Sequence, residues 1–236
     1  MTEMVKAHLN GEFDIIIPKH RADRPDWYTD EGWEKPRLSH MHKNIGKDDV
    51  VYYVGAEEGE MPALCAMWGA EVLLFEPNPK VWSNTKAIWI ANKLKTPVTF
   101  QGFCSNETRI VDFTNGLKTG FPACADDEII AAHGFKELYL EAQNYNQIKL
   151  DDVVEKYPPP TMITFDCEGS DWEVLKGAEQ ILRKYKPKIY ASIHPEFMYA
   201  QWGQYSSDFR NWIKDIGYSE LILDYKHELH CYYESI

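Results

Sequence analysis

The feature that most constrains the fold is an alternation of strand-like and helix-like segments that begins near residue 50. Residues 50–54 form a short β-branched and aromatic run that ends at Gly55, and residues 71–75 form a second run that ends in Glu-Pro-Asn-Pro. Strands separated by helices run parallel, because the crossover helix returns the chain to the same end of the sheet. The alternation therefore predicts a doubly wound α/β domain with a mostly parallel sheet over residues 50–236.

Further elements are expected from hydrophobic periodicity and from signals at element ends. Residues 162–165 are an apolar run that leads into Asp166. Ser170 and Glu173 have the spacing of a capping box that starts a helix, and helical periodicity precedes Gly217, which would end another helix. The other expected elements are strands at 98–103, 187–193, 220–224 and 229–233, the last two as an antiparallel hairpin, and helices at 62–68 and 81–89.

Two segments lack this regularity. The first 49 residues mix proline, charge and tryptophan, with a possible helix at 29–44. Residues 116–147 are less regular and predict strands, an insertion and a helix near 126–133. We therefore expect a main domain at 50–236 and an N-terminal arm or cap at 1–49.

Composition and charge exclude several classes of protein. Of 236 residues, 44% are hydrophobic and 14% aromatic, which is ample for a core and excludes a disordered chain. No apolar run approaches the roughly 20 residues that cross a bilayer, and the first residues lack the apolar region of a secretion signal. The net charge of -12 would repel a nucleic-acid backbone. Five scattered cysteines without a C-x-x-C pattern predict free thiols in a cytoplasmic protein.

A glycine-containing turn, Gly55-Ala56-Glu57-Glu58-Gly59, joins the first strand of the alternating region to its helix. Glycines at this junction let the backbone approach a ligand at the carboxyl edge of the sheet. The spacing is G-x-x-x-G, not the G-x-G-x-x-G of dinucleotide sites, and the two glutamates would repel a pyrophosphate. The turn favours a cationic or zwitterionic ligand, with an ordinary strand-to-helix turn as the alternative.

Glu76 lies at the end of the second strand, 21 residues after Gly55. An acid about 20 residues beyond a glycine turn can accept hydrogen bonds from a ribose diol. On its own, such a glutamate is more commonly a solvated loop residue. Together with the turn, and without a pyrophosphate cradle, it predicts S-adenosylmethionine (SAM) as cofactor in preference to NAD.

Asp166 and Glu168 follow the central apolar strand. Two carboxylates placed two residues apart could converge on a metal, a substrate hydroxyl or the SAM ammonium. Favourable electrostatics at a helix N-terminus would explain Asp171 and Glu173. They explain Asp166 poorly, because it ends an apolar strand, where a buried charge needs a partner.

His194 follows the strand at 187–193 and is a candidate general base at the same sheet edge. A structural hydrogen-bonding role is commoner for a lone histidine, and that alternative stays open. The remaining histidine pairs, His40 with His42 and His227 with His230, have no third ligand nearby in sequence and are interpreted as surface residues.

Residues 51–92 contain VGAEEG and LLFEPNP, and residues 148–196 contain IKLDDVV, ITFDCEGSDWEVLKGAEQIL and KPKIYASIHPEF. These two runs resemble the FkbM-type methyltransferases. The paired signature, E-P-N-P followed by D-x-E-G-x-x-x-x-V-L-x-G, is specific as a set. The resemblance implies a class I, seven-stranded, Rossmann-like methyltransferase fold that transfers a methyl group from SAM, usually to a hydroxyl oxygen.

The resemblance also implies site residues. The glycines would line the methionine end of SAM, Glu76 would bind its ribose, and the residues after the third strand would lie near adenine. The implied cofactor-binding set is Tyr53, Gly55, Glu57, Gly59, Glu76, Pro77, Asn78, Phe103 and Cys104, and the implied catalytic set is Asp166, Glu168 and His194.

Three positions depart from the family pattern. Its first motif usually reads D-V-G-A-N-x-G, whereas this chain has Tyr53 for the Asp and Glu57 for the Asn. Tyr53 cannot supply the carboxylate that often holds the cofactor's ammonium, so Glu57 or Glu58 is the expected substitute. Ser192 stands where many members carry Glu, and we accordingly expect no metal site.

These observations predict a SAM-dependent O-methyltransferase acting on a hydroxyl of a glycan or another small polyol-like acceptor. Asp166 or His194 would be the base, and Glu168 would orient the acceptor. The eight tryptophans are compatible with sugar stacking. The alternatives are a non-catalytic SAM-binding or interaction module of the same fold, or an NAD-dependent Rossmann oxidoreductase. No nucleic-acid or membrane partner is expected, and no oligomeric state is indicated.

Overall fold

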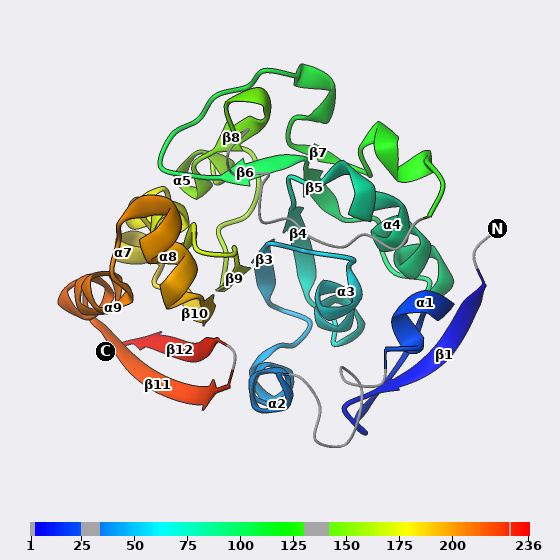
Figure 1. Ribbon diagram of the computed structural model, residues 1–236, viewed down its shortest axis with the longest axis horizontal. Coiled ribbons are helices and arrows are strands. Elements are labelled where there is room, and N and C mark those ends of the chain that lie inside the picture. The colour runs from blue at the N-terminus through cyan, green and yellow to red at the C-terminus, as the bar shows by residue number, and fades with distance from the viewer. Residues whose placement is uncertain (1–2, 25–33, 130–141, 227) are drawn as a thin grey trace.

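The computed structural model describes residues 3–24, 34–129, 142–226 and 228–236. Figure 1 shows a central sheet with helices on both of its faces. The strand order is β11-β12-β10-β9-β3-β4-β5-β7. The strands are β3 (Val50–Val54), β4 (Glu71–Phe75), β5 (Val98–Phe100), β7 (Lys118–Thr119), β9 (Met162–Asp166), β10 (Lys188–Ile193), β11 (Tyr218–Tyr225) and β12 (Leu229–Ser235).

The sheet is mostly parallel, as predicted. Strands β5, β4, β3, β9 and β10 pair in parallel. Strand β12 is antiparallel to both β10 and β11, so the expected closing hairpin is confirmed. The two-residue strand β7 adds an eighth, antiparallel strand beside β5. Because the central strands are parallel, the carboxyl ends of β3, β4, β9 and β10 meet at one edge of the sheet.

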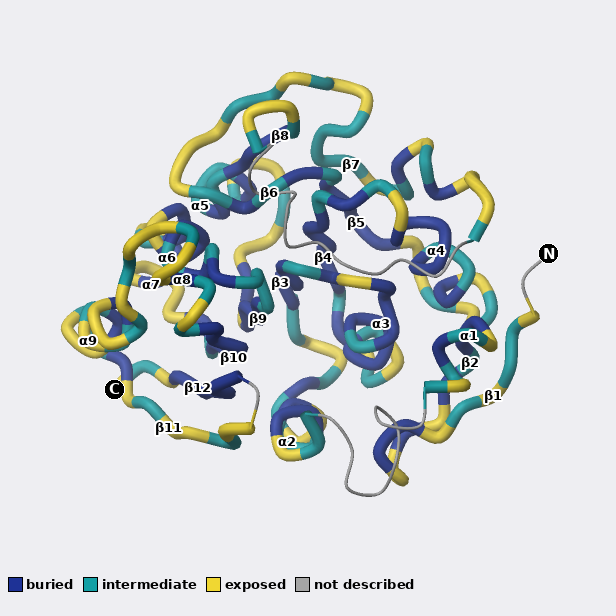
Figure 2. Tube along the Cα trace, viewed as in Figure 1, coloured by how far each residue is buried: buried dark blue, intermediate teal, exposed yellow. Residues whose placement is uncertain are grey.

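Helices cover the sheet because each central strand is apolar on both sides. Tyr52 and Val54 of β3 enter one hydrophobic cluster, and Val51 and Tyr53 enter the other. Figure 2 shows these strands as the buried centre of the molecule. The first cluster contains buried residues of α5 (Leu150–Val153), α6 (Asp171–Lys176), α7 (Glu179–Tyr185), α8 (Pro195–Trp202) and α9 (Ser206–Asp215), and the second those of α2 (Lys35–Asn44), α3 (Glu60–Met67) and α4 (Trp82–Ala91).

The helix expected after Ser170 is present but broken into α6 and α7. A Cβ at Gly177 would lie 2.0 Å from the carbonyl oxygen of Ser105, so the chain packs against the Ser105 backbone where the two helices meet. The predicted capping box is wrong: the Ser170 hydroxyl donates to the Cys167 carbonyl at 2.9 Å, and Glu173 accepts from the Gln204 amide at 2.7 Å. Helix α8, which follows β10 directly, was not predicted.

The single strand expected at 98–103 is also wrong. Strand β5 ends at Phe100, and β6 (Gly102–Cys104) pairs in parallel with β8 (Asn146–Ile148) outside the main sheet. A Cβ at Gly102 would lie 2.3 Å from the Asn146 carbonyl oxygen, so glycine permits this close pairing. In the irregular segment, a 3-10 helix, η4 (Ala123–Asp126), ends where a helix was expected to begin, and residues 130–133 of that expectation lie outside the described residues.

The N-terminal segment contains a hairpin that the sequence reading missed. Strands β1 (Met4–Leu9) and β2 (Phe13–Pro18) pair antiparallel, and the four-residue helix α1 (Lys19–Ala22) follows. Ile15 and Ile17 join the cluster that contains Trp82 and Trp89 of α4. The Asn92 amide fixes the hairpin by bonding both the N–H and the carbonyl of Ile16, at 2.9 and 2.7 Å.

The helix expected at 29–44 is found as α2 from Lys35 onward, and residues 29–33 lie outside the described residues. Buried residues of α2 contribute to the same cluster as the hairpin and α4. Within the described ranges, each helix is too short or too polar to span a membrane.

Candidate active site

A cavity of about 750 Å³, including its open mouth, lies at the carboxyl edge of the sheet. The ends of β3, β4 and β9 with the loops that follow them, the strand β6 and one residue of α8 form its wall. The lining residues are Val54, Gly55, Glu57, Phe75, Glu76, Pro77, Gly102, Phe103, Cys104, Asp166, Cys167, Glu168, Ser170 and Gln201.

The cavity brings together most of the residues that the sequence singled out. Gly55, Glu57, Glu76, Pro77, Phe103, Cys104, Asp166 and Glu168 all line it. Tyr53, Gly59, Asn78 and His194 do not.

The glycine turn is shaped first by contacts within the protein. Gly55 has a φ of +77°, and a Cβ there would lie 1.9 Å from the carbonyl oxygen of Asp166. Gly59 has a φ of +97°, and a Cβ there would lie 2.9 Å from Thr85 of α4. Gly55 therefore lets the ends of β3 and β9 approach each other, and Gly59 lets the start of α3 pack on α4.

Glu76 connects the loops that follow β3 and β4. Its side chain accepts hydrogen bonds from the backbone N–H of Glu57 at 3.1 Å and of Asn78 at 2.8 Å. Glu76 is only 5% exposed. Burial raises the pKa of its carboxyl to about 8, although the two N–H donors act in the opposite direction.

Asn78, which the sequence placed in the cofactor set, has a local structural role. Its side-chain oxygen accepts from the backbone N–H of Lys80 at 2.9 Å and so caps η2 (Pro79–Val81). Its own N–H donates to Glu76. Asn78 therefore supports Glu76 from outside the cavity.

An apolar wall lies beside Glu76. The Phe103 ring packs edge-on against Tyr145, with ring centroids 5.7 Å apart and planes at 87°. Cys104 is buried, and burial raises the pKa of its thiol well above the ordinary value, so the thiol stays neutral. These side chains suit a flat aromatic group placed between Glu76 and β6.

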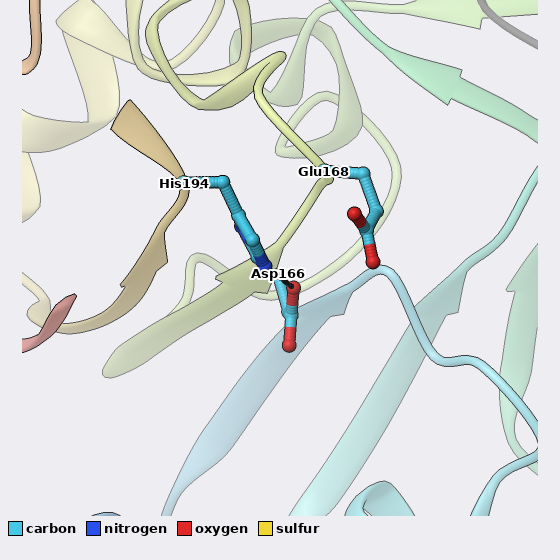
Figure 3. A group of neighbouring side chains, drawn as sticks. All are labelled: Asp166, Glu168 and His194. Atoms are coloured by element: carbon cyan, nitrogen blue, oxygen red, sulfur yellow. Dashed lines mark ion pairs between the residues drawn. The ribbon is translucent and has the colours of Figure 1, made fainter. Parts of the chain in front are cut away.

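Acidic groups meet at the other end of the cavity. Figure 3 shows Asp166 at the end of β9, Glu168 on the loop beyond it, and His194 reaching over from the end of β10. One possible metal-binding atom from each of these three residues lies within 4.8 Å of the other two. Burial, reinforced by the carboxylates of Glu34 and Glu57, raises the pKa of Asp166 well above its ordinary value.

His194 belongs to this group but does not line the cavity. The residue is 8% exposed, and its imidazole stacks on Phe197, with ring centroids 5.5 Å apart and planes at 11°. Its Nε2 atom lies 3.2 Å from Glu228 Oε2 and 3.8 Å from Asp166 Oδ1. His194 can therefore act on a ligand in the cavity through Asp166.

Glu228 was missed by the sequence reading. It is 5% exposed, and burial together with the nearby Asp166 charge raises the pKa of its carboxyl to about 9. It directly precedes β12, whose Leu229 is paired with Ile193 of β10. The hairpin register, had it been assigned residue by residue, would have placed Glu228 beside His194.

A second cavity of about 390 Å³ adjoins the first and shares Gly55, Glu57 and Asp166 with it. Tyr53 lines this second cavity together with Arg37. The Arg37 guanidinium forms an ion pair with Glu34 and donates to the Thr164 hydroxyl at 2.7 Å. Neither Arg37 nor Glu34 was singled out from the sequence, because α2 carries no recognisable motif.

The two glutamates of the turn differ in their partners. Glu58 is buried and accepts from Arg21 at 3.2 Å and from Asn84 at 2.8 Å, so it fastens the N-terminal segment to α4. Glu57 is exposed and lines both cavities. Of the two glutamates expected to replace the missing carboxylate at position 53, the geometry favours Glu57.

Two of the histidines interpreted as surface residues are not at the surface. His230 is 4% exposed and lies 3.0 Å from the Ser192 hydroxyl, and burial lowers its pKa to about 4. His40 is partly buried and lies 2.8 Å from the Tyr190 hydroxyl. His42 is exposed as expected, and His227 lies outside the described residues.

Comparison with known proteins gives one curated relative that is similar in sequence. The chain is 27% identical over 161 residues to the hexuronic acid methyltransferase AglP of Haloferax volcanii. The match covers 64% of this chain and 59% of AglP, so the chain spans less than two thirds of that relative's length.

Solved structures are similar in fold. The FkbM methyltransferase of Methylobacillus flagellatus KT matches with a TM-score of 0.54 and 18% identity, over 84% of this chain and 50% of that one. TYW2 of M. jannaschii, solved with AdoMet, matches with a TM-score of 0.50 and 12% identity, over 100% of this chain and 88% of that one. At these identities the likeness concerns the fold alone, and it confirms the class I methyltransferase fold.

A family model decides the membership. The model described as Methyltransferase FkbM domain matches residues 49–220, which runs from the start of β3 into β11 and includes every loop that forms the first cavity. The chain therefore belongs to the FkbM methyltransferase domain family.

Proposed function

We propose that this protein is a SAM-dependent methyltransferase that methylates a hydroxyl oxygen of a saccharide or similar polyol. One observation carries the proposal. In a chain of the FkbM family, a single cavity has a buried, backbone-bonded carboxyl, Glu76, at one end, and the carboxyls of Asp166 and Glu168 at the other. The first end suits a nucleoside, and the second suits proton transfer from an acceptor.

The cavity residues fit SAM in three places. The Glu76 carboxyl, held by two backbone N–H groups, would accept from the ribose hydroxyls. Phe103 and Cys104 would contact adenine. Glu57, at the junction of the two cavities, would attract the cofactor's ammonium in place of a carboxylate at Tyr53. SAM supplies a methyl group on a positively charged sulfur, which is a strong electrophile.

The protein's contribution to transfer is positioning and removal of one proton. As the acceptor oxygen bonds to the methyl carbon, the carbon–sulfur bond breaks and the hydroxyl proton must leave. Asp166 lines the cavity and its pKa is raised, which makes its carboxylate a stronger base than an ordinary one. We therefore assign Asp166 as the base, Glu168 as the group that orients the acceptor, and His194 as a residue that positions Asp166.

A saccharide acceptor is supported by two observations. The relative AglP is named as a hexuronic acid methyltransferase. In addition, Tyr199 and Trp202 of α8 and Tyr205 beyond it are 58%, 41% and 57% exposed, and the same helix contributes Gln201 to the cavity wall. Exposed aromatic rings on and just after this helix offer flat faces to the C–H groups of a sugar.

Two other functions stay as alternatives. A non-catalytic module of the same fold would keep the cofactor end and lack turnover. An NAD-dependent oxidoreductase is disfavoured by the G-x-x-x-G spacing and by Glu57, whose negative charge would face a pyrophosphate. With a net charge of -12, a nucleic-acid acceptor remains disfavoured.

Calorimetric titration with S-adenosylhomocysteine (SAH) and, separately, with NAD tests the cofactor. Binding of SAH alone is expected, whereas binding of NAD alone would overturn the proposal. Transfer of a labelled methyl group from SAM to a panel of hexuronic acids, neutral sugars and amines then tests the acceptor. Labelled amines without labelled sugars would contradict O-methylation, and SAH binding without transfer to any of the panel would favour the non-catalytic module.

A further inference from the structure

Four ionisable side chains converge around Asp166. On the side of the first cavity, Asp166 can place an oxygen within 4.8 Å of ligand atoms from Glu168 and His194. Figure 3 shows these three side chains. On the other side, it meets Glu34 and Glu228 within the same distance. Four carboxyl groups and one imidazole, drawn from four separate segments of the chain, therefore surround one small volume.

Positive charge within the described residues does not balance this cluster. The Arg37 guanidinium is already committed to Glu34 and to the Thr164 hydroxyl. His194, close to both Glu228 and Asp166, is the other group that can carry positive charge against them. Carboxylates packed this closely repel one another unless protons or a cation neutralise them.

One buried atom points independently to a missing ligand. Glu228 is 5% exposed, and its Oε2 atom has no hydrogen-bond partner within the described part of the chain. A buried carboxylate oxygen normally accepts hydrogen bonds, because leaving it unpaired is costly. This oxygen faces His194 Nε2 at 3.2 Å and belongs to the group formed with Glu34 and Asp166.

Within each of the two groups of three, the distances suit ligands of one metal ion. For an ion bound at about 2.2 Å, between the values typical of magnesium and calcium, neighbouring ligand atoms lie about 3.1 Å apart and opposite ones about 4.4 Å apart. His194 Nε2 lies 3.2 Å from Glu228 Oε2 and 3.8 Å from Asp166 Oδ1, and each group of three lies within 4.8 Å. The stacking of His194 on Phe197 holds the imidazole in this position.

We propose that this cluster binds one divalent metal ion, with Asp166 as the central ligand and Glu168, His194 and Glu228 around it. Several carboxylate oxygens with one imidazole nitrogen favour an oxygen-preferring ion that accepts nitrogen, such as Mn²⁺, over a thiolate-preferring one. Our expectation of no metal rested on Ser192, and Glu228 supplies the missing carboxylate from beside the neighbouring strand, β12.

The ion would border the cavity at the end where the proposed acceptor binds. A metal-bound hydroxyl loses its proton more readily than a free one. This role, unlike metal binding itself, rests on the proposed function. With the ion bound, the metal would lower the pKa of the acceptor hydroxyl. Removal of its proton would then depend less on Asp166 as a base.

The test is a titration of the purified full-length chain, stripped with EDTA and dialysed, with Mn²⁺ alone. Electron paramagnetic resonance reports free Mn²⁺ directly. We expect one bound equivalent, with affinity reduced at least tenfold in Asp166→Asn and in Glu228→Gln. Glu107→Gln is the matched control, because Glu107 is an exposed loop carboxylate outside the cluster. The Mn²⁺ affinity of Glu107→Gln should equal that of the parent.

The parent titration is decisive even where a variant fails to fold. No bound equivalent at about 1 mM Mn²⁺ would overturn the proposal, since built sites bind far more tightly. Parent-like affinity in folded Asp166→Asn and Glu228→Gln would overturn it as well. Pulsed resonance adds a ligand assignment: coupling of Mn²⁺ to an imidazole nitrogen should be present in the parent and absent in His194→Gln.

SAH binding measured in EDTA separates this inference from the proposed function. Mn²⁺ binding without SAH binding would leave the metal site standing and remove the methyltransferase proposal. SAH binding without Mn²⁺ binding would remove the metal site and leave Asp166 as a metal-free base.

Discussion

The two ends of the cavity are built on different physical principles. At the proposed cofactor end, Glu76 is fixed by two backbone N–H groups, and Phe103 and Cys104 provide an apolar wall. At the acidic end, Asp166 and Glu168 meet other ionisable side chains across the sheet edge. The first end is held by local backbone geometry, which is rigid. The second depends on charges whose balance changes with protonation or with a bound cation, and this is the end at which chemistry is expected.

The largest effect should come from the acidic end. Asp166→Asn keeps the shape of the side chain and removes its charge. We expect single-turnover methyl transfer at saturating SAM to fall at least about a hundred-fold, the usual scale for losing a general base, while SAH affinity stays within about threefold. A parallel loss of SAH affinity and rate would mean that the two ends are not functionally separate.

His194→Gln is the matched variant for that experiment. Since His194 does not line the cavity and reaches it only through Asp166, we expect a smaller loss, about tenfold, with unchanged SAH affinity. Should His194→Gln lose more rate than Asp166→Asn, histidine would be the base and our assignment would be reversed.

A substitution at the proposed cofactor end should lower SAH affinity and leave the rate of methyl transfer nearly unchanged. Glu76→Ala removes the carboxyl that would bind ribose, and we expect SAH affinity to fall about ten- to a hundred-fold, equivalent to about 1.5–3 kcal/mol. The rate at saturating SAM should stay near that of the parent. A thermal melt accompanies the titration, because Glu76 also joins two loops. A folded variant with parent affinity would show that the cofactor lies elsewhere.

Measuring affinity at several pH values tests whether the ionised carboxylate of Glu76 binds the ribose. Burial raises the pKa of Glu76 to about 8, so below that pH the ligand must bind after a proton is lost. Affinity for methylthioadenosine, which has ribose and adenine but no ammonium, should rise about tenfold from pH 6 to pH 7 and level off above pH 8. Glu76→Gln should remove this dependence. A flat profile in the parent would show that the ribose does not bind an ionised Glu76.

The same contrast explains which residues of the site could be predicted from the sequence. Glu76, Asp166 and Glu168 come directly after apolar runs, and parallel strands bring such positions to one edge whatever the details of packing. Glu34, Arg37 and Glu228 reach that edge from segments distant in the sequence.

Their placement depends on how α2 packs and on the register of β12 against β10, neither of which a local pattern encodes. The break at Gly177 has the same origin, since its cause is a contact with the distant Ser105. The sequence therefore predicted the scaffold and the edge residues better than the full set of charges around Asp166.

The smallest predicted effect tests the boundary between the two ends. Glu57 lines both cavities, whereas Glu58 is already bonded to Arg21 and Asn84. If Glu57 attracts the cofactor's ammonium, Glu57→Gln should weaken SAH binding about three- to fivefold, the scale of one solvent-exposed charge pair. Binding of methylthioadenosine, which lacks the ammonium, should not change. Equal losses for the two ligands would show instead that Glu57 acts by orienting Glu76 through its backbone N–H, in which case the cofactor end would extend across the whole glycine turn.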